Sequence, residues 1–167
     1  LFLLDVKRGD IDSTADAYAH AYFNPSSPIR VDAITLSPYL GVKALKSSFE
    51  LAAKYGCGIF VVVRSSNPEG EALQTARHAN GKMVWEEMAA QITEFNRALS
   101  SHAVGPIGAV VGATCNDAGP VVESMPHSYF LSPGIGAQGA TLDDCRARLR
   151  PALGRILPNV SRELIGK

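Results

Sequence analysis

The chain has 167 residues, and its 16 lysine and arginine residues balance its 16 aspartate and glutamate residues, so the formal net charge is zero. This balance excludes the large basic surface with which proteins bind nucleic acids or anionic membranes. No apolar run reaches the length of about 18 residues that a membrane-spanning helix needs. Because 46% of the residues are hydrophobic, we expect one domain with a buried core.

The three cysteines stand far apart in the sequence, at Cys57, Cys115 and Cys145. An odd number of cysteines without a C-x-x-C pair argues against a disulfide framework and against a zinc site. We therefore expect a cytoplasmic protein that binds no metal. The four histidines are dispersed as well, and we interpret them as surface or packing residues.

Six short apolar segments predict β-strands. Most of them are continuous rather than alternating with polar residues, which is typical of parallel strands that are buried on both faces. We expect the first strand at the very start of the chain. The predicted strands are residues 1–6, 31–36, 58–63, 107–112, 129–131 and 155–157.

Segments with a hydrophobic period of 3.6 residues lie between these strands and predict helices. Residues 13–22 begin with Ser13-Thr14-Ala15-Asp16, which is similar to a capping box with aspartate in place of glutamate. Residues 44–55 carry apolar side chains on one side. Residues 82–99 give the clearest apolar stripe, and a weaker helix is expected over residues 142–149.

The alternation of strand and helix, repeated about six times along the chain, predicts an α/β fold with right-handed crossovers. Two architectures share this pattern, namely an open doubly wound sheet and a (β/α)8 barrel. In both of them, ligands bind at the carboxyl ends of the strands. The loops that follow the predicted strands are therefore the first place to look for chemistry.

The first candidate cluster consists of Asp5, Lys7 and Asp10, at the end of the first predicted strand. Residues 5 and 7 of a strand point to the same side, so both side chains would face the mouth of a barrel. A lysine between carboxylates is held in its charged form, which suits a fixed cation and proton donor better than a Schiff-base nucleophile. An ion pair beside a solvated turn would give the same pattern.

The second candidate is a glycine-rich loop after the fifth predicted strand, with Gly134, Gly136 and Gly139 in a G-x-G-x-x-G arrangement. A dinucleotide-binding fingerprint is disfavoured, because no acidic residue follows about 20 positions later. A phosphate site fits better, since glycines let backbone N–H groups approach an anion and the Gln138 amide would donate to it. An ordinary tight turn is the alternative.

Two further polar segments follow predicted strands. Residues 64–70, with Ser66 among them, carry hydroxyl and amide groups that suit the polar edge of a base or a sugar, and simple turn chemistry explains them as well. The last predicted strand leads to Arg162, which would lie beside the same anion as the glycine-rich loop. The sequence contains no Ser-His-Asp arrangement of the kind found in hydrolases.

The pattern Asp5-x-Lys7-x-x-Asp10-Ile11-x-x-Thr14 resembles the signature of orotidine 5′-phosphate decarboxylases. The resemblance extends along nearly the whole chain. Residues 35–41, 63–70 and 132–139 are similar to the subgroup of this family that is found in mycobacteria and related bacteria. The first motif is shared with sugar-phosphate decarboxylases and aldol-type synthases of the same suprafamily, whereas the combination of all these segments in this order is specific.

The resemblance implies a (β/α)8 barrel that converts orotidine 5′-monophosphate to UMP and CO2, the last step of de novo pyrimidine synthesis. It also implies a homodimer with shared active sites, and neither a metal nor an organic cofactor. Lys7 would stabilise the vinyl carbanion that the loss of CO2 leaves, and would then supply the proton. Asp5 would orient Lys7, and Asp10 would complete the charged array in the partner subunit's site.

The same resemblance assigns the groups that bind the substrate. Thr14 would contact the ribose in the partner subunit's site, Ser66 would hydrogen-bond the pyrimidine, and Pro133 would line its pocket. Gln138 and Arg162 would grip the 5′-phosphate. This grip is remote from the reacting bond, so its binding energy would serve to order the site.

A complete barrel of this type has about 250 residues. We therefore expect residues 1–167 to form a single barrel domain that lacks its first two βα units and comprises about strands three to eight. The family also needs a first lysine of the charged array and an acidic ribose ligand from earlier strands, so we expect this chain to be inactive alone. The alternatives are a Mg²⁺-dependent sugar-phosphate decarboxylase or synthase and a non-catalytic nucleotide-phosphate binding domain.

Overall fold

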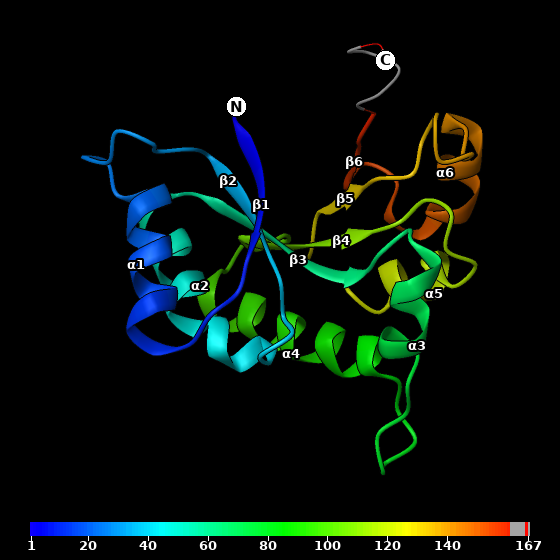
Figure 1. Cartoon of the computed structure of the whole chain (residues 1–167), viewed down its shortest axis with the longest axis horizontal. Helices are drawn as coiled ribbons and strands as arrows, with labels where there is room; N and C mark the ends of the chain where they lie inside the picture. Colours follow the sequence, from blue (N-terminus) through cyan, green and yellow to red (C-terminus); the bar gives the residue numbers. More distant parts are fainter. Residues whose placement is uncertain (161–165, 167) are drawn as a thin grey trace.

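The computed structural model describes residues 1–160 and Gly166, and in it six parallel strands form one sheet (Figure 1). The strands follow one another across the sheet in chain order. A doubly wound sheet reverses its strand order at one point, so the order observed is that of a (β/α)8 barrel. The strands are β1 (Leu3–Arg8), β2 (Ala33–Leu36), β3 (Gly58–Arg64), β4 (Ile107–Val111), β5 (Phe130–Ser132) and β6 (Ile156–Pro158).

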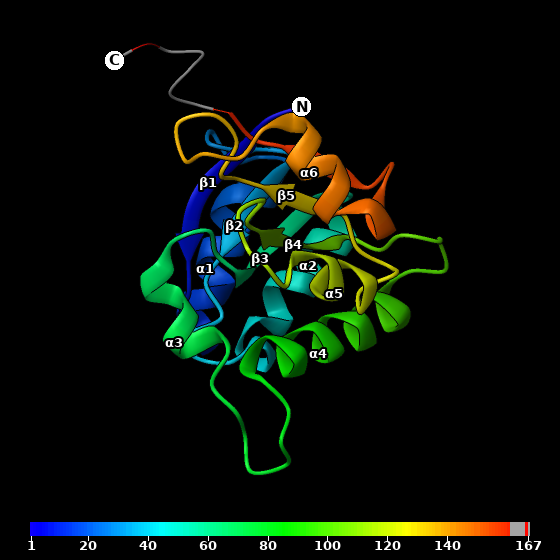
Figure 2. The same ribbon diagram turned by 90° about the vertical axis from the view of Figure 1, so that its right-hand side faces the viewer.

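Helical segments connect successive strands and lie along the outside of the sheet (Figures 1 and 2). None of the described helices is both long and apolar enough to cross a membrane. The α-helices are α1 (Asp12–Phe23), α2 (Lys46–Tyr55), α3 (Glu71–Gln74), α4 (Val84–Leu99), α5 (Ala118–Glu123) and α6 (Leu142–Arg148). The 3₁₀ turns are η1 (Val42–Leu45), η2 (Pro68–Gly70) and η3 (Arg150–Ala152).

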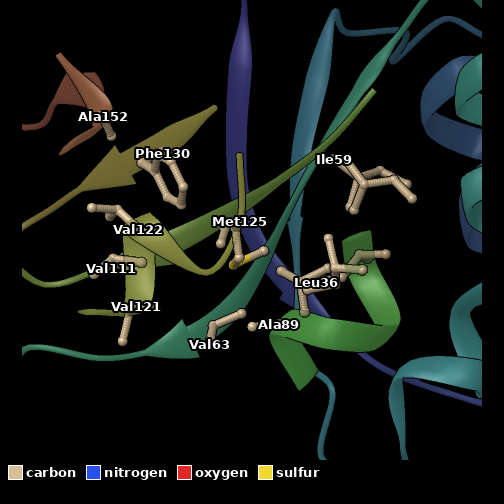
Figure 3. Packing of buried hydrophobic residues seen from close by; sticks show 14 of the residues in the cluster. Leu36, Ile59, Val63, Ala89, Val111, Val121, Val122, Met125, Phe130 and Ala152 are labelled. Carbon is tan, nitrogen blue, oxygen red and sulfur yellow. The ribbon is translucent and has the colours of Figure 1, made fainter. Parts of the chain in front are cut away.

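The main hydrophobic core lies between the helices and one face of the sheet. In β3, Ile59 and Val63 are fully buried in this core, and Figure 3 shows them among residues of the neighbouring strands and helices. The alternate residues Phe60 and Val62 belong to a separate apolar cluster, which contains residues of other strands and none of a helix. One face is thus covered by helices and the other is lined by strands alone, as in the wall of a barrel.

All six predicted strands are confirmed, and their ends differ from the predicted ends by two residues at most. Burial on both faces is confirmed for the central strands, since every residue of β4 is buried. The same prediction of burial on both faces is wrong for β1 and β6, where Leu4 and Leu157 are each 40% exposed. The reason is that β1 and β6 form the two edges of the described sheet, so each has a neighbouring strand on one side only.

The four predicted helices are confirmed, whereas α3 and α5 were not predicted, because segments of 4 and 6 residues are too short to show a helical period. The capping box predicted at Ser13 is wrong. Helix α1 begins one residue earlier, and its N-cap Ile11 makes no side-chain capping bond. A capping box with aspartate occurs instead at α6, where Thr141 Oγ1 accepts from the backbone N–H of Asp144 at 3.0 Å.

A buried amide fixes α4 to the amino-terminal end of β4. Asn96 is 1% exposed, and its Oδ1 accepts from the backbone N–H of Ile107 at 2.9 Å. Its Nδ2 donates to the carbonyl oxygens of Ile107 and His127, at 2.7 and 3.0 Å. One side chain therefore satisfies several buried backbone groups at a point where the ladder between β4 and β5 has not yet begun.

We expect Asn96→Ala to lower the free energy of unfolding by about 2–3 kcal/mol, because it removes the acceptor of the buried Ile107 N–H and the hydrogen bonds to the carbonyl oxygens of Ile107 and His127. Urea unfolding followed by circular dichroism measures this difference. The control is Asn80→Ala, since Asn80 is an exposed loop residue, for which a change within about 0.5 kcal/mol is expected. Equal effects of the two substitutions would contradict the role assigned to Asn96.

Candidate active site

A polar cleft of about 450 Å³ opens on the face of the sheet opposite the helices, at the carboxyl ends of the strands. Its apolar floor comes from the alternate strand residues Val62, Val110 and Leu131. The rim carries polar groups from segments that are far apart in the sequence. The predicted site residues that line this cleft are Asp5, Lys7, Ser66, Pro133, Gly134 and Gln138.

The charged part of the cleft is an ion pair on β1. Lys7 Nζ lies 2.5 Å from Asp5 Oδ2, and the two side chains are 54% and 51% exposed. The second carboxylate oxygen of Asp5 accepts a hydrogen bond from Thr35 Oγ1 at 2.7 Å. Because Thr35 is fully buried on β2, it anchors the ion pair to the neighbouring strand.

The backbone of Lys7 departs from regular strand geometry. Its φ is 44°, in the left-handed region that residues other than glycine rarely adopt. The pairing of β1 with β2 shifts its register between Leu4 and Arg8, and the N–H of Lys7 donates to Thr35 Oγ1 at 2.9 Å instead of to a ladder carbonyl. Strained backbone of this kind is concentrated at functional sites, which favours a functional role for Lys7.

The hydrogen bonds around Asp5 favour its ionised form. Partial burial raises the pKa of the Asp5 carboxyl, but the hydrogen bonds from Lys7 and Thr35, together with the positive charge of Lys7, outweigh burial and hold this pKa below its ordinary value. A carboxyl with a lowered pKa in the folded state adds stability above its unfolded pKa and loses it as the pH falls through the folded pKa. Because both side chains are half exposed, water screens this contribution.

The neutral part of the cleft joins two loops. Ser66, which follows β3, donates from Oγ to Gln138 Oε1 at 2.9 Å, and Gln138 lies in the loop after β5. Pro133 and Gly134 directly follow β5 and line the same cleft. The hydroxyl and amide groups that the sequence placed in separate loops therefore meet in the structure.

The glycine-rich loop needs its glycines for its shape. Gly134, Gly136 and Gly139 have φ values of 104°, 77° and 98°, a conformation that disfavours residues with a Cβ atom. The N–H groups of Gly136 and Gly139 donate to carbonyl oxygens within the loop, at 2.8 and 2.7 Å. The prediction that these glycines free their N–H groups for an anion is therefore wrong for these two, whose bonds are those of a tight turn.

Four of the predicted site residues that the structure describes do not line this cleft, namely Asp10, Thr14, Gly136 and Gly139. Asp10 accepts a hydrogen bond from the backbone N–H of Ile11 at 2.9 Å and does not line the cleft. Thr14 is exposed on α1, also away from it. Arg162 lies outside the described residues.

Two site residues were missed by the sequence analysis. Thr35 holds Asp5, and its signal is a polar residue inside the apolar segment Ala33–Leu36. Asn159 lines the cleft and directly follows β6. Its signal is a polar residue at the carboxyl end of a predicted strand. Within residues 1–160 and Gly166, no three His, Cys, Asp or Glu side chains gather as a metal site.

Comparison with known proteins identifies the family. The model of the orotidine 5′-phosphate decarboxylase / HUMPS family matches residues 1–167. The chain belongs to this family. The orotidine 5′-phosphate decarboxylase of Salinispora tropica is 48% identical over 165 residues, which are 99% of this chain and 58% of that protein. The chain thus spans less than two thirds of the length of this relative.

Solved structures of the family share the fold. A Streptomyces avermitilis protein proposed to be an orotidine 5′-phosphate decarboxylase matches with a TM-score of 0.88 and 42% identity, over 97% of this chain and 56% of that one. The UMP synthase of Leishmania donovani matches with a TM-score of 0.79 and 37% identity, over 97% of this chain and 34% of that one. The six strands described above are therefore part of the barrel of this family.

We expect Lys7→Met to raise the pKa of Asp5, because the substitution removes both a hydrogen-bond donor and a positive charge. Titration of the Asp5 carboxyl carbon by NMR in both proteins measures the shift. The difference between the free energies of unfolding of the wild type and the variant should also become smaller as the pH falls through the folded pKa of Asp5. Lys46→Met, which breaks the exposed pair between Lys46 and Glu50, should leave the titration of Asp5 unchanged; an equal shift there would contradict the assignment.

Proposed function

We propose that the protein decarboxylates orotidine 5′-monophosphate to UMP and CO2. The observation that carries the proposal is the position of one lysine ammonium, that of Lys7, held against Asp5 in the same cleft as Ser66 and Gln138. Membership of the orotidine 5′-phosphate decarboxylase / HUMPS family supports the reaction class. Because the chain spans 58% of the Salinispora tropica relative, the proposal assigns roles only to residues that this chain contains.

Lys7 is the proposed catalytic acid. Loss of CO2 from C6 of the pyrimidine leaves a carbanion without an adjacent π-acceptor, and a fixed ammonium beside that carbon stabilises the developing charge. The same ammonium then donates its proton to C6, which yields UMP. Asp5 and Thr35 support this step, since the chain of bonds from Thr35 through Asp5 to Lys7 holds the ammonium in one place.

The neutral groups are proposed to bind the rest of the nucleotide. Ser66 would hydrogen-bond the pyrimidine, Pro133 would lie against it, and Gln138 would donate to the 5′-phosphate. The bond between Ser66 and Gln138 supports this assignment, because it places the base-binding and phosphate-binding groups next to each other. Arg162 is proposed as a second phosphate ligand.

The protein is further proposed to act as a homodimer in the cytoplasm. Asp10 and Thr14 do not line the cleft of their own chain, which is consistent with a role in the site of a second copy. The three cysteines are free and buried, which suits a reducing compartment.

We expect Lys7→Ala in the full-length gene product to lower kcat for orotidine 5′-monophosphate by at least about a thousandfold, because it removes both the electrostatic stabilisation and the proton donor. Absorbance of the pyrimidine measures turnover, and circular dichroism verifies folding. Lys43→Ala, an exposed residue on η1, is the control. Substantial turnover by the Lys7 variant would refute the mechanism, and a Mg²⁺ requirement would favour a sugar-phosphate enzyme instead.

We expect Gln138→Ala to weaken UMP binding by about tenfold through the loss of a hydrogen bond to a charged group, and to leave the affinity for uridine nearly unchanged. Isothermal titration calorimetry with both ligands separates the phosphate from the nucleoside. Gln91→Ala on α4 serves as the matched control, since Gln91 lies away from the cleft. An equal loss for UMP and uridine would show that Gln138 does not bind the phosphate.

A further inference from the structure

Residues Ser65, Ser66 and Asn67 separate the candidate active site from a second cleft. All three line both clefts, and the second one, of about 460 Å³, is also lined by Arg64 and Asp117. The three residues belong to no helix or strand, so no regular β-ladder fixes them. The contacts on the side of the second cleft therefore determine how this segment faces the first.

On the side of the second cleft, the main contact to this segment is made by Gln74, the last residue of α3, which is 9% exposed. Its Oε1 accepts from the backbone N–H of Ser65 at 3.0 Å, and its Nε2 donates to Ser65 Oγ at 2.8 Å. One amide thus holds both the main chain and the side chain of Ser65. The next residue is Ser66, whose hydroxyl lies in the candidate active site.

The amide is itself held in place by a buried charge. Arg64 Nη1 donates to Gln74 Oε1 at 3.3 Å, and Arg64 Nε donates to both carboxylate oxygens of Asp117, at 3.0 and 3.1 Å. The Arg64 side chain is only 6% exposed and that of Asp117 is 27% exposed, so the pair is partly shielded from water. The orientation of Gln74 is therefore set by the protein interior.

Close packing leaves this segment little room to shift. A Cβ atom on Gly70 would lie 2.6 Å from Ser65 Oγ and 3.1 Å from Gln74 Nε2. A Cβ atom on Gly112 would lie 2.7 Å from the Cα of Ser66. The backbone at both glycines therefore lies directly against Ser65 and Ser66 and cannot give way. A substitution at Gln74 is then expected to shift the two serines themselves.

We propose that Gln74 is a positioning residue for substrate binding, which holds Ser65 and thereby sets the direction in which Ser66 presents its hydroxyl to the candidate active site. Gln74 does not itself line that site, so it acts only through the segment that it holds. The proposal rests on the function proposed above, because it needs Ser66 to bind the base of the substrate.

The test is Gln74→Met in the full-length gene product, a substitution of similar length that removes all the hydrogen bonds of the amide. We expect kcat/KM for orotidine 5′-monophosphate to fall by roughly tenfold to a hundredfold, since a small displacement of a substrate-binding group has effects of this size. KM and the Kd for UMP should rise together. Gln74→Glu keeps acceptors for the N–H and the hydroxyl of Ser65 and should restore most of the activity.

A double-mutant cycle with Ser66→Ala distinguishes positioning from general stability. Once the Ser66 hydroxyl is absent, Gln74→Met should lower kcat/KM little further, because both substitutions remove the same interaction. Fully additive losses would overturn the proposal. The matched control is Gln91→Met, the same substitution at a half-buried site on α4, which should leave kcat/KM unchanged.

The outcomes separate this inference from the proposed function. An inactive wild-type protein would overturn the proposed function and this inference with it. An active wild type together with a folded Gln74→Met protein of unchanged kcat/KM would overturn this inference alone. If Gln74→Met does not fold, Ser65→Ala removes only the hydroxyl held by Gln74 Nε2, and an unchanged kcat/KM in that variant would overturn the inference as well.

Discussion

The order of the strands is the constraint on which the rest of the structure depends. Each parallel strand lies beside the next one in the chain, so the right-handed connections all place their helices on the same face. The opposite face is left to residues such as Phe60 and Leu131, and all carboxyl ends meet at one edge. For this reason Asp5 on the first strand shares a cleft with Gln138, which follows the fifth.

Within that cleft, solvent decides how strongly the charges act. Lys7 and Asp5 are in contact, but half of each side chain is exposed, and water weakens the interaction of charges at such positions. In the reaction proposed above, a nucleotide that covers the cleft would exclude this water, and the ammonium would then act on the reacting carbon through a medium of lower dielectric constant. The hydrogen bond from the buried hydroxyl of Thr35 holds Asp5, and with it the ion pair, in a fixed position although the pair is half exposed to solvent.

Much of this arrangement follows from sequence patterns, and the exceptions have physical reasons. The apolar runs predicted every strand, and their ends located Lys7, Ser66 and Gln138 on one rim. The sequence did not indicate the positive φ of Lys7, because its register shift is settled by contact with Thr35 on another strand. Nor did it indicate Gln74, since a four-residue helix has no period to detect. The role proposed for Gln74 also depends on its contact with a backbone group that is nine residues away in the sequence.

The two buried amides, Asn96 and Gln74, show how position gives the same interaction different consequences. Each accepts a hydrogen bond from the backbone N–H of one residue and donates a hydrogen bond to another group of that same residue. Asn96 acts at the amino-terminal end of β4, where a barrel has only its stability to maintain. Gln74 acts just beyond the carboxyl end of β3, where the chain that it orders lines the candidate active site. Loss of the first amide should therefore appear in unfolding, and loss of the second in binding as well.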